Sequence, residues 1–187
     1  GTQQPTLIVS LLGTIATDAK NVVKTMDPSF KNKGNVIYLL GRISDDISTS
    51  EYLESYHGIT NSPLPEFDLE FETKLQNAVK ELIKQNLIES ASPVSKGGVF
   101  FSLLRAGWVN ELGFDITTAA ETRIDSFLFG EAMGRIIVGV DPAVEDEFVD
   151  LMFDSKIPFF TLGHVTKGEI RIDDVSFGYI DKMSETL

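Results

Sequence analysis

Residues 36–40, with the sequence VIYLL, form a continuous apolar run that follows the turn-like KNKGN and ends at Gly41. An apolar run of this length without polar interruptions is typical of a strand that is buried on both faces of a sheet. Residues 7–12, LIVSLL, repeat the pattern and end at a glycine, and Arg135–Val140, RIIVGV, gives a third run. We therefore predict that all three runs lie inside one sheet.

The segments between these runs show helical periodicity or turn composition. Residues 69–86 are predicted to form a long helix, residues 144–155 an acidic amphipathic helix with a solvated charged face, and a further helix begins near Gly98. Residues 59–68, ITNSPLPEFD, have the composition of a surface loop, and the preceding SEYLESYHG reads as a short helix. The apolar stripe of the long helix consists of Phe71, Leu75, Ala78, Val79, Leu82 and Ile83.

The C-terminal third predicts several closely spaced strands. Residues 157–165 and Glu169–Ile172 are predicted to pair as a hairpin around residues 166–168, and Asp173 with Asp174 forms a turn before the strand-like Val175–Tyr179. Strands this close together leave no room for parallel crossovers. The predicted fold is α/β (α+β), a mixed β-sheet covered by helices, within a single domain that spans residues 1–187.

Composition and charge exclude several classes of protein. The 187 residues are 42% hydrophobic and 24% charged, as in an ordinary globular domain. The formal net charge of -12 disfavours nucleic acid and anionic membranes as partners, and no apolar run approaches the roughly 18 residues of a spanning helix. The chain has no cysteine, which fits a cytoplasmic protein, and its two histidines, His57 and His164, are too far apart in sequence to predict a metal site.

The stretch 87–104, LIESASPVSKGGVFFSLL, holds the first candidate site: Ser95, Lys96, Gly97 and Gly98. Two glycines at a loop-to-helix junction can expose backbone N–H groups to an anion, and the lysine adds a positive charge, so the loop is a candidate for binding phosphate or a nucleotide. The alternative is structural: the glycines allow close packing while Ser95 caps the helix. The sequence matches neither GxxxxGK[ST] nor GxGxxG.

The second candidate is Glu131, which lies between two glycines in LFGEAMGR. Its carboxylate could bind a substrate amine or magnesium, or it could be a solvent-facing glutamate of a loop, with Arg135 as a nearby partner. His57 precedes Gly58 at the end of a short helix, and we interpret both histidines as structural or solvated. We expect no catalytic residue and no metal ligand on this chain.

The order of motifs resembles that of the C-terminal domain of the aminoimidazole ribonucleotide synthetase superfamily. Within it, the SEYL segment followed by a Pro-rich link and a long helix favours the phosphoribosylformylglycinamidine synthases. The resemblance covers nearly the whole chain. It is carried by PTLIVSLLGTI (5–15), GNVIYLLG (34–41), TSEYLESYHG (49–58), PEFDLEFETKLQNAV (65–79), LIESASPVSKGGV (87–99), LGFDI (112–116), LFGEAMGRIIVGV (128–140) and IPFFTLGHV (157–165).

The resemblance implies one domain of an ATP-dependent ligase that converts formylglycinamide ribonucleotide to its amidine with ammonia from glutamine. ATP and Mg²⁺ are the cofactors of the full enzyme, and a glutaminase and a small accessory subunit are its partners. This chain resembles the last C-terminal domain of that multidomain synthase. We therefore expect it to pack against the other domains, to be mainly architectural and to be inactive alone. The apolar face left by a missing neighbour would also allow two copies of the chain to pair.

The residues depart from the family's pattern at both candidate sites. The family's loop of His, Asp, Val, Ser, Asp or Glu, Gly, Gly corresponds to residues 92–98, where Pro93 and Lys96 replace the two carboxylates. Of the substrate motif Glu, Ser, Gln, only Glu131 is kept. The resemblance therefore implies that this copy kept the fold and lost much of the ligand chemistry. The alternatives are a stand-alone module that binds a nucleotide or phosphate, and another enzyme of the superfamily.

Overall fold

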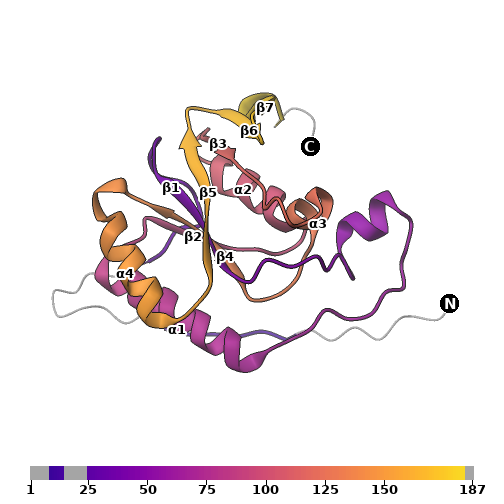
Figure 1. The fold of residues 1–187 in the computed structure, drawn as a ribbon, viewed down its shortest axis with the longest axis horizontal. Helices are drawn as coiled ribbons and strands as arrows, with labels where there is room; N and C mark the ends of the chain where they lie inside the picture. Colours follow the sequence, from indigo (N-terminus) through magenta and orange to yellow (C-terminus); the bar gives the residue numbers. More distant parts are fainter. Residues whose placement is uncertain (1–8, 15–24, 184–187) are drawn as a thin grey trace.

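The computed structural model describes residues 9–14 and 25–183, and its centre is a seven-stranded sheet with the order β2-β4-β1-β5-β3-β6-β7 (Figure 1). All neighbouring strands are antiparallel except β3 and β6, which run parallel, so the predicted mixed sheet is confirmed. The strands are β1 (Val36–Gly41), β2 (Ser90–Pro93), β3 (Gly113–Ile116), β4 (Arg135–Val140), β5 (Phe159–Thr166), β6 (Glu169–Ile172) and β7 (Val175–Tyr179).

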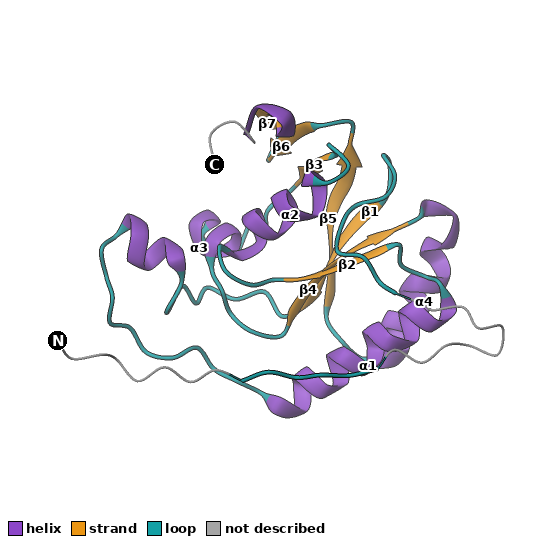
Figure 2. Cartoon of the chain, turned by 180° about the vertical axis from the view of Figure 1, so that it is seen from behind, coloured by secondary structure: helices purple, strands orange, loops and turns teal. Residues whose placement is uncertain are grey.

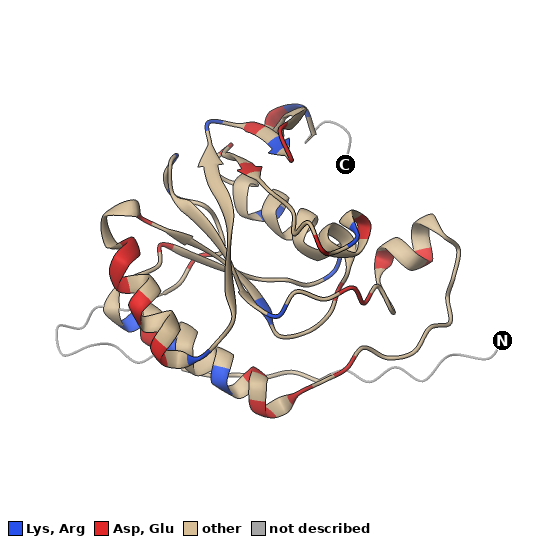
Figure 3. Cartoon of the chain, in the orientation of Figure 1, with Lys and Arg blue, Asp and Glu red and all other residues tan. Residues whose placement is uncertain are grey.

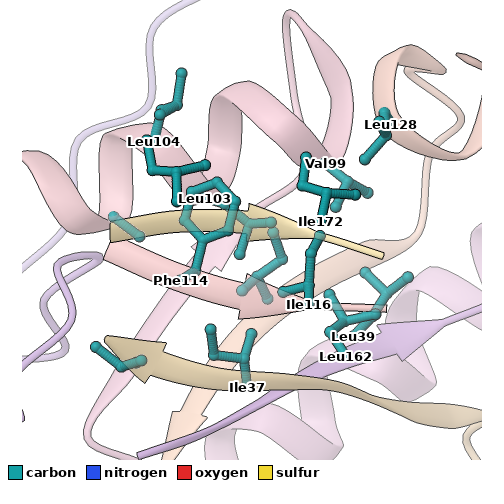
Figure 4. Close-up of a cluster of buried hydrophobic side chains, with 14 of the residues drawn as sticks. Ile37, Leu39, Val99, Leu103, Leu104, Phe114, Ile116, Leu128, Leu162 and Ile172 are labelled. Atoms are coloured by element: carbon teal, nitrogen blue, oxygen red, sulfur yellow. The ribbon is translucent and has the colours of Figure 1, made fainter. Parts of the chain in front are cut away.

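Helices cover both faces of this sheet, as Figure 2 shows, with α2 and α3 on one side and α1 and α4 on the other. Successive residues of β1 point into opposite cores, because Ile37 and Leu39 join the cluster under α2 while Tyr38 and Leu40 join the cluster under α1. Figure 4 shows the first of these clusters. The helices are α1 (Leu69–Gln85), α2 (Gly98–Trp108), α3 (Ile124–Phe129), α4 (Glu145–Ser155) and α5 (Ile180–Met183), with a π-helical turn η1 (Tyr52–Tyr56) and a 3-10 turn η2 (Pro142–Val144).

The long helix α1 is confirmed close to its predicted ends. Asp68 caps its start by accepting a hydrogen bond from the Phe71 N–H at 2.9 Å, and Asn86 ends it in the left-handed conformation with φ of 58°. Four of the six predicted stripe residues are buried, and the outer two are half-buried. On α4, Asp146, Glu147, Asp150 and Asp154 are exposed, as the solvated face predicts, and Figure 3 shows the acidic residues of this helix in red.

The strand predicted for residues 7–12 is wrong in the part that the structure describes. Residues 9–12 form no strand, and Val9, Leu11 and Leu12 are 74%, 95% and 102% exposed, whereas residues 7 and 8 lie outside the described ranges. A strand needs a neighbour for its backbone N–H and C=O groups, and residues 9–12 pair with no strand of the described sheet. Apolar composition alone did not place this run in the sheet.

The predicted hairpin of residues 157–165 with Glu169–Ile172 is also wrong, because β3 lies between β5 and β6. Phe114 pairs with Val165 on one side and with Ile170 on the other. The chain therefore crosses over β3 instead of folding straight back. The hairpin of this region is β6–β7, where Asp173 and Asp174 both have positive φ angles of 49° and 65°, as the two central residues of a type I′ turn require.

No helix in the described residues is both long enough and apolar enough to cross a membrane.

Candidate functional site

The structure brings the two candidate sites together at the start of α2. The N–H of Gly97 donates a hydrogen bond to Oε1 of Glu131 at 2.8 Å. The N–H of Glu51 donates to the same oxygen, also at 2.8 Å. One half-buried carboxylate oxygen therefore joins two segments that are far apart in the sequence, the loop before α2 and the segment that leads into η1.

The two glycines of the loop are required by backbone geometry. Gly97 and Gly98 have φ angles of +86° and +72°, in the left-handed region that favours glycine. A Cβ on Gly98 would lie 2.6 Å from the carbonyl oxygen of Leu128 and 2.7 Å from that of Gly130. The loop therefore packs backbone against backbone on the end of α3, which supports the structural alternative for the glycines.

Ser95 does not cap α2, so that expectation is wrong. The N-cap residue is Gly97, and no side chain caps the helix. Ser95 instead accepts the backbone N–H of Gly98 on its carbonyl oxygen at 2.8 Å, which closes a tight turn. Arg105, in the last turn of α2, donates hydrogen bonds to the Lys96 carbonyl at 3.0 Å and to the Ser95 hydroxyl at 3.2 Å. The loop is thus held by the helix that it precedes.

Lys96 is exposed, and its Nζ lies 2.6 Å from Oε1 of Glu51. The hydrogen bond from Lys96 lowers the pKa of the Glu51 carboxyl below its ordinary value, and the same contact raises the pKa of Lys96. Glu131 and Glu54 add further negative charge near the ammonium group. The sequence predicted that the positive charge of Lys96 could bind a phosphate. In the structure, carboxylates of the chain itself balance that charge.

Arg135 is buried behind Glu131 and positions its turn. Its guanidinium donates to the carbonyl oxygen of Ala132 at 3.0 Å and to that of Gly130 at 2.8 Å. Burial lowers the pKa of Arg135 to about 10, and the charge of Glu131 opposes that shift. Arg135 thus remains a cation at neutral pH, and it acts on Glu131 through backbone hydrogen bonds and through space, without a direct hydrogen bond to the carboxylate.

The histidines have the surroundings that the structural interpretation predicts. His57 is the C-cap of η1, and its backbone N–H donates to the carbonyl of Glu54. Gly58 follows with a φ of +68°. The imidazole lies edge-on to two tyrosine rings, and its centroid is 4.9 Å from that of Tyr52 and 5.0 Å from that of Tyr56. His164 is an exposed residue of β5.

A cavity of about 300 Å³ lies beside the turn that carries Glu131. Its walls come from the chain that leaves β1, the chain that enters α1, and the turn 132–134, and include Arg42, Asp46, Phe67, Asp68, Phe71 and Met133. Across the described ranges, 9–14 and 25–183, no group of three or more Asp, Glu or His side chains is arranged to hold a metal ion. The donors around Glu131 are N–H groups and an ammonium, which do not suit a divalent cation.

Sequence comparisons relate this chain to one family. Residues 32–174 match the C-terminal domain of AIR synthase related proteins. The phosphoribosylformylglycinamidine synthase subunit PurL of Alkaliphilus metalliredigens is 31% identical over 172 residues, which are 92% of this chain and 23% of that protein. The chain therefore spans about a quarter of the length of such relatives.

Solved structures share the fold. Thermotoga maritima PurL complexed with FGAR superposes with a TM-score of 0.72 and 15% sequence identity, over 85% of this chain and 29% of that one. Thermotoga maritima PurL complexed with ATP gives a TM-score of 0.65 and 14% identity, over 84% and 27%. At these identities the likeness concerns the fold alone.

Proposed function

Because the chain belongs to the family of AIR synthase related proteins, as their C-terminal domain, we propose that it is one domain of the synthetase subunit of a phosphoribosylformylglycinamidine synthase. That enzyme would join formylglycinamide ribonucleotide and glutamine-derived ammonia at the expense of ATP, in the cytoplasm. The names of the relatives and the SEYL segment support this choice over other members of the superfamily. A glutaminase and a small accessory subunit are the proposed partners.

Within that enzyme we assign this domain a mainly architectural role. One observation carries the assignment: the Glu131 carboxylate takes the N–H groups of Gly97 and Glu51. These two hydrogen bonds hold the loop before α2 and the segment that leads into η1 against the turn of Glu131. Ser95, Lys96, Gly97 and Gly98 are then at most an accessory element that faces phosphate, and Oε1 of Glu131 already accepts two backbone hydrogen bonds, so a substrate contact would fall to its other oxygen.

The proposed cofactors, ATP and Mg²⁺, belong to the rest of the enzyme in this assignment. Mg²⁺ prefers carboxylate, carbonyl and water oxygens in a near-octahedral arrangement. The loop carries Pro93 and Lys96 at the places where the family's pattern has carboxylates, and Lys96 brings a positive charge to the same place. The residues present here do not fit a magnesium ion.

An apolar hollow supports packing against neighbouring domains. It has a volume of about 450 Å³ between α2 and β7 and is lined by Phe100, Phe101, Leu104, Phe177, Tyr179 and Met183 among others. Phe177 and Tyr179 are each about half exposed. Large exposed aromatic side chains that gather in one place are typical of an interface.

A comparison of the chain with the complete subunit tests the proposal. The complete subunit, supplied with ammonia, should catalyse ATP-dependent amidation of formylglycinamide ribonucleotide, and the 187-residue chain should not. Turnover by the chain alone would contradict the assignment.

Calorimetry distinguishes this proposal from the alternative, a stand-alone binding module. That alternative predicts micromolar binding of ATP, ADP or phosphate to the chain. Binding that is lost in a Gly98→Leu variant that keeps its fold would favour that alternative. No heat with any of the three would remove it.

A further inference from the structure

Residues 42–68, here called the strap, leave the sheet after β1 and return to it only at the start of α1. Figure 1 shows the strap running out past α3, where it carries η1, and then back toward α1. Its two ends are tied to each other, because Arg42 pairs with Asp68 at 3.3 Å and its guanidinium lies 4.2 Å from the centre of the Phe71 ring. The strap is therefore a long loop whose two ends lie side by side.

The outer part of the strap has little support from the hydrophobic core. Ser50 is the only buried residue in 42–68, a segment that the structure describes in full, and residues 54–61 are all exposed. A segment without a buried apolar face depends on a few specific contacts to stay closed.

Four contacts attach the outer strap to the body of the domain, one of which is a hydrogen bond that the Tyr52 hydroxyl donates to Oδ2 of Asp125 at 3.5 Å. The Tyr52 ring stacks on Phe129 with centroids 5.2 Å apart and an interplanar angle of 18°. Lys96 pairs with the Glu51 side chain in an exposed ion pair, which contributes little in water. The Glu51 N–H donates to Glu131, and a hydrogen bond to a carboxylate is stronger than one between neutral groups.

The contact through Glu131 differs from the other three because Glu131 connects three parts of the domain. The same oxygen that accepts the strap's N–H accepts that of Gly97, at the start of α2. Residues 132–134, which follow Glu131 directly, form one wall of the 300 Å³ cavity, and both ends of the strap form other walls. A change at Glu131 thus reaches the strap, the diglycine loop and the cavity.

From this geometry we propose that Glu131 is an internal latch. Its carboxylate fills a site made by two backbone N–H groups and holds the strap closed against α2 and α3, which keeps the walls of the cavity in place. When the carboxylate is removed, the strap opens while the sheet and its two cores stay folded. A free carboxylate of small size can replace the side chain in the vacated site. The proposal concerns this domain's own conformation and does not depend on the enzyme to which the domain belongs.

Residue-resolved hydrogen exchange on the 187-residue chain tests the latch. In Glu131→Ala, the amides of Gly97 and of strap residues 51–59 should exchange about tenfold faster or more, because two hydrogen bonds to a charged group are lost. The amides of β1 and β4 should keep their protection. Formate added to Glu131→Ala should restore the protection of Glu51 and Gly97 together.

Two further variants make the result specific. Lys96→Ala removes only the exposed ion pair and should leave strap exchange within about twofold of the parent chain. Glu121→Ala, at an exposed glutamate, is the matched control and should change nothing. Unchanged strap exchange in Glu131→Ala, or a larger effect in Lys96→Ala than in Glu131→Ala, would overturn the proposal, as would a failure of formate to restore both amides.

If Glu131→Ala does not fold, Glu131→Gln decides the question, because the amide keeps an acceptor oxygen of the same reach without the charge. The proposal then requires intermediate exchange at Glu51 and Gly97 with an unchanged near-ultraviolet circular dichroism spectrum. Exchange equal to that of the parent chain at both amides would count against the latch.

Discussion

The phenol of Tyr38 donates a hydrogen bond to Oε1 of Glu145 at 2.5 Å and so connects strand β1 with the first turn of α4. The ring is buried and packs against Phe148, with centroids 4.7 Å apart. We predict that Tyr38→Phe lowers the free energy of unfolding by about 1.5–2 kcal/mol, because a charged acceptor loses its donor and the apolar packing is kept. Urea unfolding measures this value. Tyr56→Phe, on an exposed side chain, is the control and should leave it unchanged.

The same tyrosine gives the chain a predictable response to alkaline pH. Burial, and then the nearby Glu145, raise the pKa of Tyr38 above its ordinary value of 10.0. The folded state therefore disfavours the phenolate, so the contribution of Tyr38 is complete below pH 10 and is lost as the pH rises through the raised pKa. Stability measured above pH 10 should fall more steeply in the parent chain than in Tyr38→Phe. Parallel slopes would show that the phenol makes no difference.

Alanine should destabilise the domain far more at Gly98 than at a glycine that has the same backbone conformation but open space where a Cβ would lie. Gly98→Ala combines a left-handed backbone with a Cβ that meets carbonyl oxygens of the α3 end, and should cost roughly 2–5 kcal/mol. At Gly58, with φ of +68°, a Cβ would meet nothing within 4 Å, so Gly58→Ala should cost only about 1–2 kcal/mol. Thermal or urea unfolding of both variants gives the difference. Equal costs would mean that the loop moves away from α3 easily.

Arg135 is predicted to stabilise the domain through the turn that presents Glu131. Arg135→Met keeps the length of the side chain but leaves the carbonyls of Gly130 and Ala132 without their donor, and should lower the free energy of unfolding by about 2 kcal/mol. Arg123→Met, at an exposed arginine, should change it by less than about 0.5 kcal/mol. An unchanged or higher stability of Arg135→Met would mean that the desolvation of the guanidinium outweighs its hydrogen bonds.

The sequence predicted the elements that carry their own periodicity. The runs at β1 and β4 and the stripe of α1 are long enough for the apolar pattern to identify them. β3 was missed because its four residues, GFDI, include a glycine and an aspartate and are too few to show a pattern. Its position between β5 and β6 depends on pairing between distant residues, which no local pattern records.

The candidate site was predicted in its parts but not as a whole. Gly97, Gly98 and Glu131 stood out by residue type, but their contact spans 34 positions in the sequence. Glu51 contributes its backbone N–H, a group that every residue except proline has, so no signal in its side chain could have identified it. Arg135 was considered as an ionic partner of Glu131, and its hydrogen bonds to two carbonyls follow only from the geometry of the turn.

The parallel pairing of β3 with β6 has a consequence for the order of folding. β3 leaves the ribosome well before both of its partners, β5 and β6, so both of its edges are unpaired while α3, β4 and α4 are synthesised. Closure of this part of the sheet brings together residues of high contact order, and such steps are slow. Newly made chains should therefore pass through a stage in which both edges of β3 are unpaired, and unpaired edges are prone to aggregation.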